Sequence, residues 1–160
     1  MTKIILTCLS ILAIIITAMI IFNNRTPKLR GLDLGDQVFI PCDSSVFSAP
    51  HCIASDGSGY DGDMKLFPYV DTLPLMIKRL DKAIEQTALK RHEKQKLVYE
   101  DSTARHYVFT TQIMRYKDDL LFVFDYANKV LHYRSSSRIG YDDFNQNKER
   151  MNEILFSLAQ

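Results

Sequence analysis

Hydrophobic residues form an unbroken block near the start of the chain, from Ile4 to Phe22, with no charged side chain among these nineteen residues. About 20 apolar residues span the hydrocarbon core of a bilayer as a helix, so the block predicts a membrane span. It is longer than the core of a usual cleaved signal peptide, and no small-residue cleavage site follows it. Cys8 lies too early in the block for a lipoprotein signal. We therefore predict an uncleaved anchor over residues 1–23, with residues 4–22 in the lipid bilayer.

Polar and turn-forming residues dominate the next stretch, up to residue 70. Residues 24–36 have too few apolar side chains to pack alone and are interpreted as a tether. Residues 37–70 contain several prolines and glycines and predict a long irregular segment that wraps a folded domain. Within it, residues 56–63 are rich in Asp and Gly, but their spacing does not match a calcium-binding loop. No metal site is predicted, and residues 37–160 are expected to form a single domain.

Helical periodicity extends from Thr72 to about Arg91, where apolar side chains recur every three or four residues. The resulting stripe consists of Leu73, Met76, Ile77, Leu80, Ile84, Thr87 and Ala88. A stripe of this kind is typical of a helix that packs on a hydrophobic core.

From Lys96 onward the period changes to two, which is typical of strands. Four strands are expected, over residues 97–100, 105–114, 120–126 and 130–135. Short turns join them, including one at Lys117-Asp118-Asp119, so the strands should form an antiparallel meander.

A second helix is predicted from about Phe144 to Leu158, and Asp143 with Gln146 resembles a capping box at its start. Its inward-facing residues are expected to be Phe144, Met151, Ile154, Leu155 and Leu158. The expected fold is therefore α+β, a two-layer domain with an antiparallel sheet of about four strands and two packed helices.

The stretch from Arg134 to Arg150 is the most distinctive in the chain, and it supports two interpretations. Asn147 falls in the middle of an apolar helical stripe, where an amide must be hydrogen-bonded. In the first interpretation Gly140, Asp143 and Asn147 form a structural clamp, in which Asn147 bonds the backbone of the turn. In the second, the stretch forms a pocket for an anionic ligand such as a carboxylate or phosphate. The residues of this anion pocket would be Arg134, Ser135, Ser137, Arg138 and Arg150.

Catalytic, cofactor and nucleic-acid functions have less support. No serine has a histidine and an acid within reach by sequence, and the four histidines show no paired spacing, so no catalytic residue or cofactor is predicted. Lys3 is the one basic residue before residue 23, so the remaining 19 Lys and Arg balance the 19 Asp and Glu. Nucleic-acid binding needs a basic surface, and this balance argues against it.

The cysteines and the flanking charges point to opposite sides of the membrane. Cys42 and Cys52 lie ten residues apart, a span that a disulfide can close, although two unrelated thiols or a metal site are alternatives. A disulfide persists only in an oxidising compartment. Basic residues, however, are more numerous after the apolar block than before it, which by the positive-inside rule favours a cytoplasmic domain.

The residues Arg134-Ser-Ser-Ser-Arg138-Ile-Gly140-Tyr-Asp-Asp143, followed by Asn147 and Arg150, resemble the C-terminal signature of the domain of unknown function 1499 family. That signature is close to Arg-Ser-x-Ser-Arg-x-Gly, an Asp, then Asn-x-x-Arg. The stretch Ser48–Ser55 is similar to the family's Pro-Asn-Cys-Val-Ser-Ser box, with His51 in place of Asn and Ala54 in place of Ser. The resemblance covers residues 38 to 159.

The resemblance implies a small exported, lipid-anchored or lumenal protein with no established activity, and its cysteines favour a domain outside the cytoplasm. We accordingly expect a single-pass membrane protein of the cell envelope, with its domain on the periplasmic or another extracytoplasmic side. It would act as a non-enzymatic binding or structural module with an envelope partner. The alternative is a small enzyme or binding protein that holds an anionic small molecule with Arg134, Arg138 and Arg150.

Overall fold

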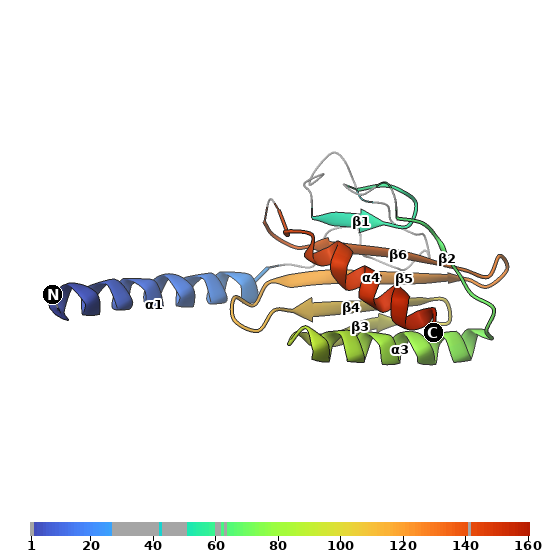
Figure 1. The fold of residues 1–160 in the computed structure, drawn as a ribbon, viewed down its shortest axis with the longest axis horizontal. Helices are drawn as coiled ribbons and strands as arrows, with labels where there is room; N and C mark the ends of the chain where they lie inside the picture. Colours follow the sequence, from blue (N-terminus) through green and yellow to red (C-terminus); the bar gives the residue numbers. More distant parts are fainter. Residues whose placement is uncertain (1, 27–41, 43–50, 60–61, 63, 141) are drawn as a thin grey trace.

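The computed structural model describes residues 2–26, 42, 51–59, 62, 64–140 and 142–160. Most of the predicted tether and of residues 37–50 lies outside the described residues. The first helix, α1 (Thr2–Asn24), projects from one end of a folded domain (Figure 1). It is long and apolar enough to cross a membrane, and the domain buries none of its most apolar stretch.

The centre of the domain is an antiparallel sheet. Among the described residues it contains six strands, β1 (Cys52–Ala54), β2 (Phe67–Pro68), β3 (Lys94–Glu100), β4 (Ala104–Thr110), β5 (Lys117–Asp125) and β6 (Val130–Ser137). The order across the sheet is β1-β6-β5-β4-β3, and β2 also pairs with β6. The predicted α+β class is confirmed, but the predicted number of about four strands is wrong. The additional strands β1 and β2 contain three and two residues, too few for an alternation that a sequence can reveal.

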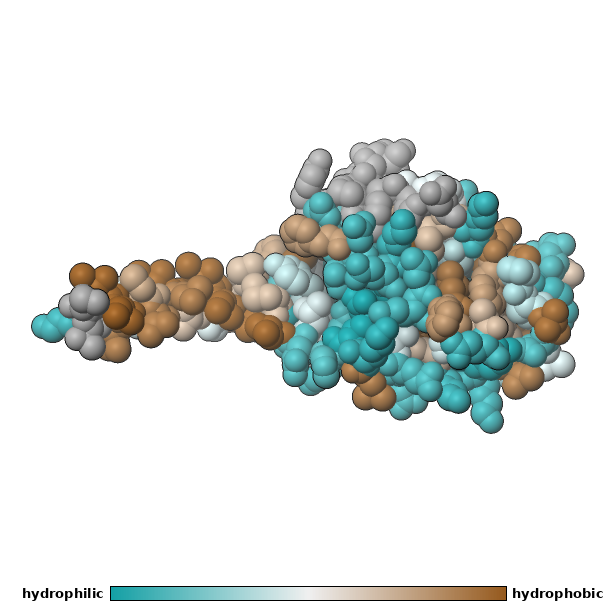
Figure 2. Space-filling view, in the orientation of Figure 1, coloured by the Kyte–Doolittle hydropathy of each residue, from teal (hydrophilic) through white to brown (hydrophobic). Residues whose placement is uncertain are grey.

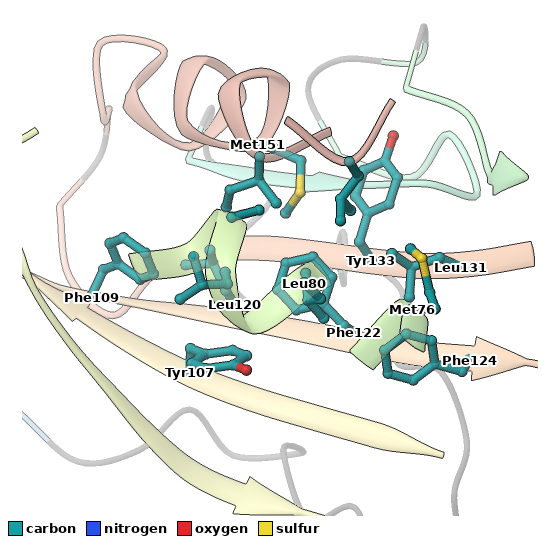
Figure 3. Packing of buried hydrophobic residues seen from close by; sticks show 14 of the residues in the cluster. Met76, Leu80, Tyr107, Phe109, Leu120, Phe122, Phe124, Leu131, Tyr133 and Met151 are labelled. Carbon is teal, nitrogen blue, oxygen red and sulfur yellow. The ribbon is translucent and has the colours of Figure 1, made fainter. Parts of the chain in front are cut away.

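The helices α3 (Leu73–Lys90) and α4 (Gln146–Leu158) cover one face of the sheet (Figure 1). Alternate side chains of β4, β5 and β6 point towards them and form the main hydrophobic core (Figure 3). Labelled members of this core include Leu80 from α3, Met151 from α4, and Tyr107, Phe122 and Tyr133 from the sheet. The stripe of α3 therefore packs as its periodicity predicts, with Met76, Leu80 and Ile84 nearly inaccessible to solvent.

Two local predictions are wrong. Phe144 does not face inward but is 80% exposed, because α4 begins only at Gln146, after two residues with left-handed backbone, Phe144 and Asn145. Lys117-Asp118-Asp119 is not a turn but the start of β5, and both acids are buried. Charged residues beside an apolar strand look like a turn in a sequence, whereas here each carboxylate has a buried partner.

The end of α1 contacts the turn between β4 and β5. Asn23 is only 2% exposed, and its Nδ2 donates a hydrogen bond to the backbone carbonyl of Met114. Lys117 Nζ donates to the carbonyl of Asn24 at 2.9 Å. The turn after β4 is therefore held at the point where the apolar helix ends.

Candidate functional site

The three arginines of the signature lie on two faces of the sheet. Side chains alternate along β6, so Ser135 and Ser137 point towards the helices, whereas Arg134 and Arg138 point away from them. Arg150 comes from α4 and approaches the helix-covered face. The structure thus does not bring the guanidinium groups of Arg134, Arg138 and Arg150 together.

Arg150 projects from α4 towards the sheet and is fully buried, and its polar partners are Glu93, Asp118 and Asn147. Its Nε and Nη2 donate to the carboxylate of Glu93 at 3.0 and 2.9 Å, and Nη2 also donates to Asp118 at 2.8 Å. Its guanidinium carbon lies 5.0 Å from the centre of the Phe109 ring. Burial opposes its charge, but the charge of Asp118 and the contact with Glu93 raise the pKa of Arg150 above its ordinary value. The buried cation is therefore compensated by two carboxylates.

Asn147 connects α4 to β6 and to residue 51. Its Nδ2 donates to the backbone carbonyl of His51 and to Ser137 Oγ, both at 3.0 Å. Its Oδ1 accepts hydrogen bonds from Ser135 Oγ and from Arg150 Nη1. Both donor hydrogens and both acceptor positions of the amide are thus used. Because the contact at residue 51 is made by the backbone, a histidine at this position can supply it as well as an asparagine can.

Asp143 and Gly140 shape the turn that leads into α4. The carboxylate of Asp143 accepts the backbone N–H groups of Asn147 at 2.8 Å and of Asn145 at 3.1 Å. Gly140 has a φ of 107°, a conformation that side chains other than hydrogen rarely permit. The N-cap residue, Asn145, makes no side-chain capping bond of its own. The carboxylate of Asp143, outside the helix, caps the start of α4 in its place.

Arg138 belongs to a second buried cluster, on the face of the sheet away from the helices. Its Nε and Nη2 bond Asp119 at 2.7 and 2.8 Å, and His106 Nε2 lies 2.8 Å from the same carboxylate. Burial tends to raise the pKa of Asp119, but the hydrogen bonds from Arg138 and His106 hold it below its ordinary value. Asp119 is therefore an ionised partner of Arg138 at neutral pH.

Arg134 lies beside the disulfide. Cys42 and Cys52 are bonded to each other, with Cα atoms 5.9 Å apart, and Arg134 Nε lies 3.3 Å from Cys52 Sγ. Cys52 is in β1, which pairs with β6, so the bond attaches residue 42 to the edge of the sheet. Cys8 of α1 is a free, exposed thiol.

A cavity of about 220 Å³ lies at the end of the domain where β6 leads into α4. Three connections contribute to it, namely the one before β3, the turn between β4 and β5, and the turn between β6 and α4. It is lined by Glu93, Thr111, Tyr116, Asp118, Ser137, Ile139, Gly140, Asp142, Asp143, Phe144, Gln146 and Arg150.

Of the predicted anion-pocket and clamp residues, four line this cavity, namely Ser137, Gly140, Asp143 and Arg150, whereas Arg134, Ser135, Arg138 and Asn147 do not. The acids Glu93 and Asp118 were missed, as were Tyr116 and Phe144. The sequence feature that could have indicated the two acids is Arg150, since an arginine on the core side of a helix requires acidic partners elsewhere in the chain.

Metal binding and serine activation both depend on how side chains are grouped in the described part of the chain. No group of three or more His, Cys, Asp or Glu side chains there has an arrangement that could hold a metal ion. Ser135 and Ser137 are hydrogen-bonded to the amide of Asn147, which is not a base. In this hydrogen-bond network, neither serine hydroxyl contacts a histidine that could act as its base.

The fold and these contacts define a class of protein, a disulfide-containing α+β domain with one apolar N-terminal helix. A family model described as "Protein of unknown function (DUF1499)" matches residues 44–158, and the chain belongs to this family. The match confirms the resemblance carried by the Arg-Ser-Ser-Ser-Arg signature. No match was found among curated proteins or among solved structures.

Proposed function

We propose that the protein is a single-pass, membrane-anchored binding module whose domain lies outside the cytoplasm. Two features support the anchor and its orientation. Figure 2 shows α1 as an apolar rod beside a domain face that is largely hydrophilic, as expected for a helix in lipid and a domain in water. The disulfide between Cys42 and Cys52 favours an oxidising compartment.

The observation that carries the binding function is the cavity between β6 and α4. Its lining combines the side chains of Ile139, Tyr116 and Phe144 with several polar groups. Binding sites for small molecules have this mixture of apolar walls and a few oriented polar groups, and a volume of about 220 Å³ suits a small ligand.

The charges around the cavity favour a cationic ligand over an anionic one. Its lining contains four carboxylates, from Glu93, Asp118, Asp142 and Asp143, and a single guanidinium, from Arg150. Arg150 is already bonded to two of these acids, so an anion entering the cavity would meet mainly negative charge. In the competing hypothesis of an anion site, Arg138 would have to exchange Asp119 for the ligand.

NMR of the full chain in detergent micelles tests this ligand class. The side-chain methyl group of Ile139 reports on the cavity, and that of Ile53, in β1, serves as a control. Titration with methylammonium should move the Ile139 signal in a saturable manner, whereas acetate and phosphate should not. A response to phosphate alone would support the anion hypothesis, and no response to any probe would contradict the binding function.

A matched pair of variants localises the binding. Asp142 and Asp125 each accept a nearby backbone N–H with Oδ1, from Phe144 and Asn128 respectively, but only Asp142 lines the cavity. Asp142→Asn should weaken the methylammonium response, and Asp125→Asn should leave it unchanged. Equal effects of the two substitutions would indicate binding outside the cavity.

The number of free thiols in cells tests the orientation. After rapid denaturation and mass-tagging of thiols, an extracytoplasmic domain should yield one tagged cysteine, Cys8, because Cys42 and Cys52 are bonded. Three tagged cysteines would place the domain in the cytoplasm. Reporter fusions to the C-terminus give an independent reading of the same orientation.

A further inference from the structure

The cavity and the end of α1 lie at the same end of the domain. Thr111 and Tyr116, in the turn between β4 and β5, line the cavity, and Met114 of the same turn accepts the hydrogen bond from Asn23. Figure 1 shows α1 leaving from the end of the domain that carries this turn. In the proposed anchor the apolar block ends at Phe22, so Asn23 and Asn24 would mark the boundary between hydrocarbon and headgroups, and the turn that bonds them would lie at the same depth.

Two large apolar side chains are exposed at this end. Ile113, in the turn after β4, is 69% exposed, and Phe144, at the edge of the cavity, is 80% exposed. Basic side chains accompany Ile113, with Arg115 and Lys117 in or beside the same turn and Arg25 directly after α1, whereas Phe144 follows the acidic Asp142 and Asp143. Apolar side chains among Lys and Arg are typical of segments that lie in the interfacial region of a bilayer.

Exposure alone does not identify a membrane contact, because single exposed apolar residues are common. Tyr126, at the start of the turn between β5 and β6, is 58% exposed, yet Figure 1 shows this turn at the end of the domain remote from α1. What distinguishes Ile113 and Phe144 is their position beside the end of the apolar helix. A position at headgroup depth converts exposed apolar surface into a favourable contact.

We propose that Ile113, Arg115, Lys117 and Phe144 form a membrane-contacting surface that rests on the lipid bilayer beside α1. Ile113 and Phe144 enter the interfacial region, and the basic side chains lie among the lipid phosphates. The contact gives the domain a fixed orientation on the bilayer, and the cavity edge at Phe144 faces the headgroups. This inference rests on the proposed anchoring of the chain by α1.

The chain contains no tryptophan, so a single introduced tryptophan reports its own position by fluorescence. Four variants of the full chain are reconstituted in phosphatidylcholine vesicles with or without brominated acyl chains, which quench tryptophan on contact. Ile113→Trp and Phe144→Trp probe the proposed surface, Tyr126→Trp probes the remote end, and Ile14→Trp probes the anchor. Thermal unfolding of each variant verifies that the domain is folded.

The proposal expects blue-shifted emission and strong quenching by brominated lipid for tryptophan at 113 and 144, and neither effect at 126. If tryptophan at 14 is quenched but those at 113 and 144 behave like that at 126, the surface is overturned and the anchor stands. If tryptophan at 14 is not quenched, the anchor and the surface are both overturned. Two probes on the surface keep the test decisive if one substitution prevents folding.

Discussion

Asn147 and Arg150 lie three residues apart on α4, and Arg150 Nη1 donates a hydrogen bond to Asn147 Oδ1 at 3.2 Å. Both side chains are fully buried, in a helix whose other buried residues include Met151, Ile154 and Leu158. The N-terminal part of α4 is therefore attached to the sheet by polar groups that satisfy one another, and the C-terminal part by apolar packing. Removing one partner from such a buried network lowers stability strongly, because the remaining polar or charged group stays buried without a partner.

Arg150→Ala should lower the free energy of unfolding by roughly 3–5 kcal/mol, because it leaves the buried carboxylate of Asp118 without a cation and removes both hydrogen bonds that Arg150 donates to Glu93. Urea denaturation of the full chain in mild detergent, followed by circular dichroism, measures the change. Lys90→Ala is the control, since it breaks the exposed ion pair between Lys90 and Glu153 and should cost about 1 kcal/mol or less. Similar values for the two variants would contradict the buried network.

Asn147→Leu conserves approximate size but removes every hydrogen bond of the amide. Ser135 Oγ, Ser137 Oγ and the carbonyl of His51 would each lose a buried partner, so we expect a loss of stability of about 3 kcal/mol or more. The same denaturation experiment on Asn152→Leu provides the comparison, because Asn152 is exposed on the same helix and should change stability by about 0.5 kcal/mol or less. A neutral Asn147→Leu would show that apolar packing alone holds α4.

Arg138→Ala decides between a structural and a ligand-binding role for this arginine. Since Arg138 forms a buried bidentate pair with Asp119, its loss should destabilise the domain by roughly 3–5 kcal/mol. Adding Asp119→Asn should recover part of that loss, because it removes the buried carboxylate charge that has lost its partner. A double-mutant cycle gives the coupling energy between the two residues. If Arg138→Ala leaves stability unchanged, the arginine is available for a ligand.

Stability should fall in acid partly through Asp119. Its pKa is lower in the folded protein than its ordinary value of 3.8, so its stabilising contribution is complete above that pH. The contribution is lost as the pH falls below 3.8 and through the lowered value, where the folded carboxyl becomes protonated. Free energies of unfolding measured from about pH 6 to pH 3 should therefore decline less steeply in Asp119→Asn than in the parent chain. Parallel curves would show that the pKa of Asp119 is not lowered.

Replacing both bonded cysteines, Cys42→Ser with Cys52→Ser, should lower the free energy of unfolding by roughly 2–3 kcal/mol, because the bond closes a short loop of the unfolded chain. Denaturation with and without a reductant measures the effect. The reductant should destabilise the parent chain and have no effect on the double variant. Cys8→Ser, which removes the free thiol of α1, is the control and should leave both results unchanged.

The periodic parts of the domain were predictable from sequence. Leu80 and Ile84 pack in the core as the stripe from Thr72 to Arg91 requires. Alternation along β6 places Ser135 on the opposite face from Arg134 and Arg138, although the anion-pocket interpretation groups all three. Phe144 was misplaced because the start of α4 depends on backbone bonds to Asp143 that periodicity does not reveal.

The cavity and the ion pairs were not predictable in the same way. Glu93, Tyr116 and Asp142 belong to three separate connections, and only the pairing of β3, β4, β5 and β6 brings them to one place. Arg138 and Arg150 are close in sequence and share a charge, which favoured a common site. Their separation follows from the sheet that lies between them, a feature of three-dimensional topology.

The consecutive carboxylates of Asp118 and Asp119 have a consequence for how β5 finds its neighbours. Each points to a different face of the sheet and bonds a different arginine, Arg150 on one side and Arg138 on the other. If β5 slipped by a single residue against β4 and β6, every side chain would exchange faces. One arginine would then meet the other aspartate, the second would meet Lys117 or Leu120 in place of a carboxylate, and Leu120 and Phe122 would leave the core. A slipped alignment would therefore leave one arginine without its carboxylate in addition to exposing core residues, and both effects favour the native strand alignment during folding.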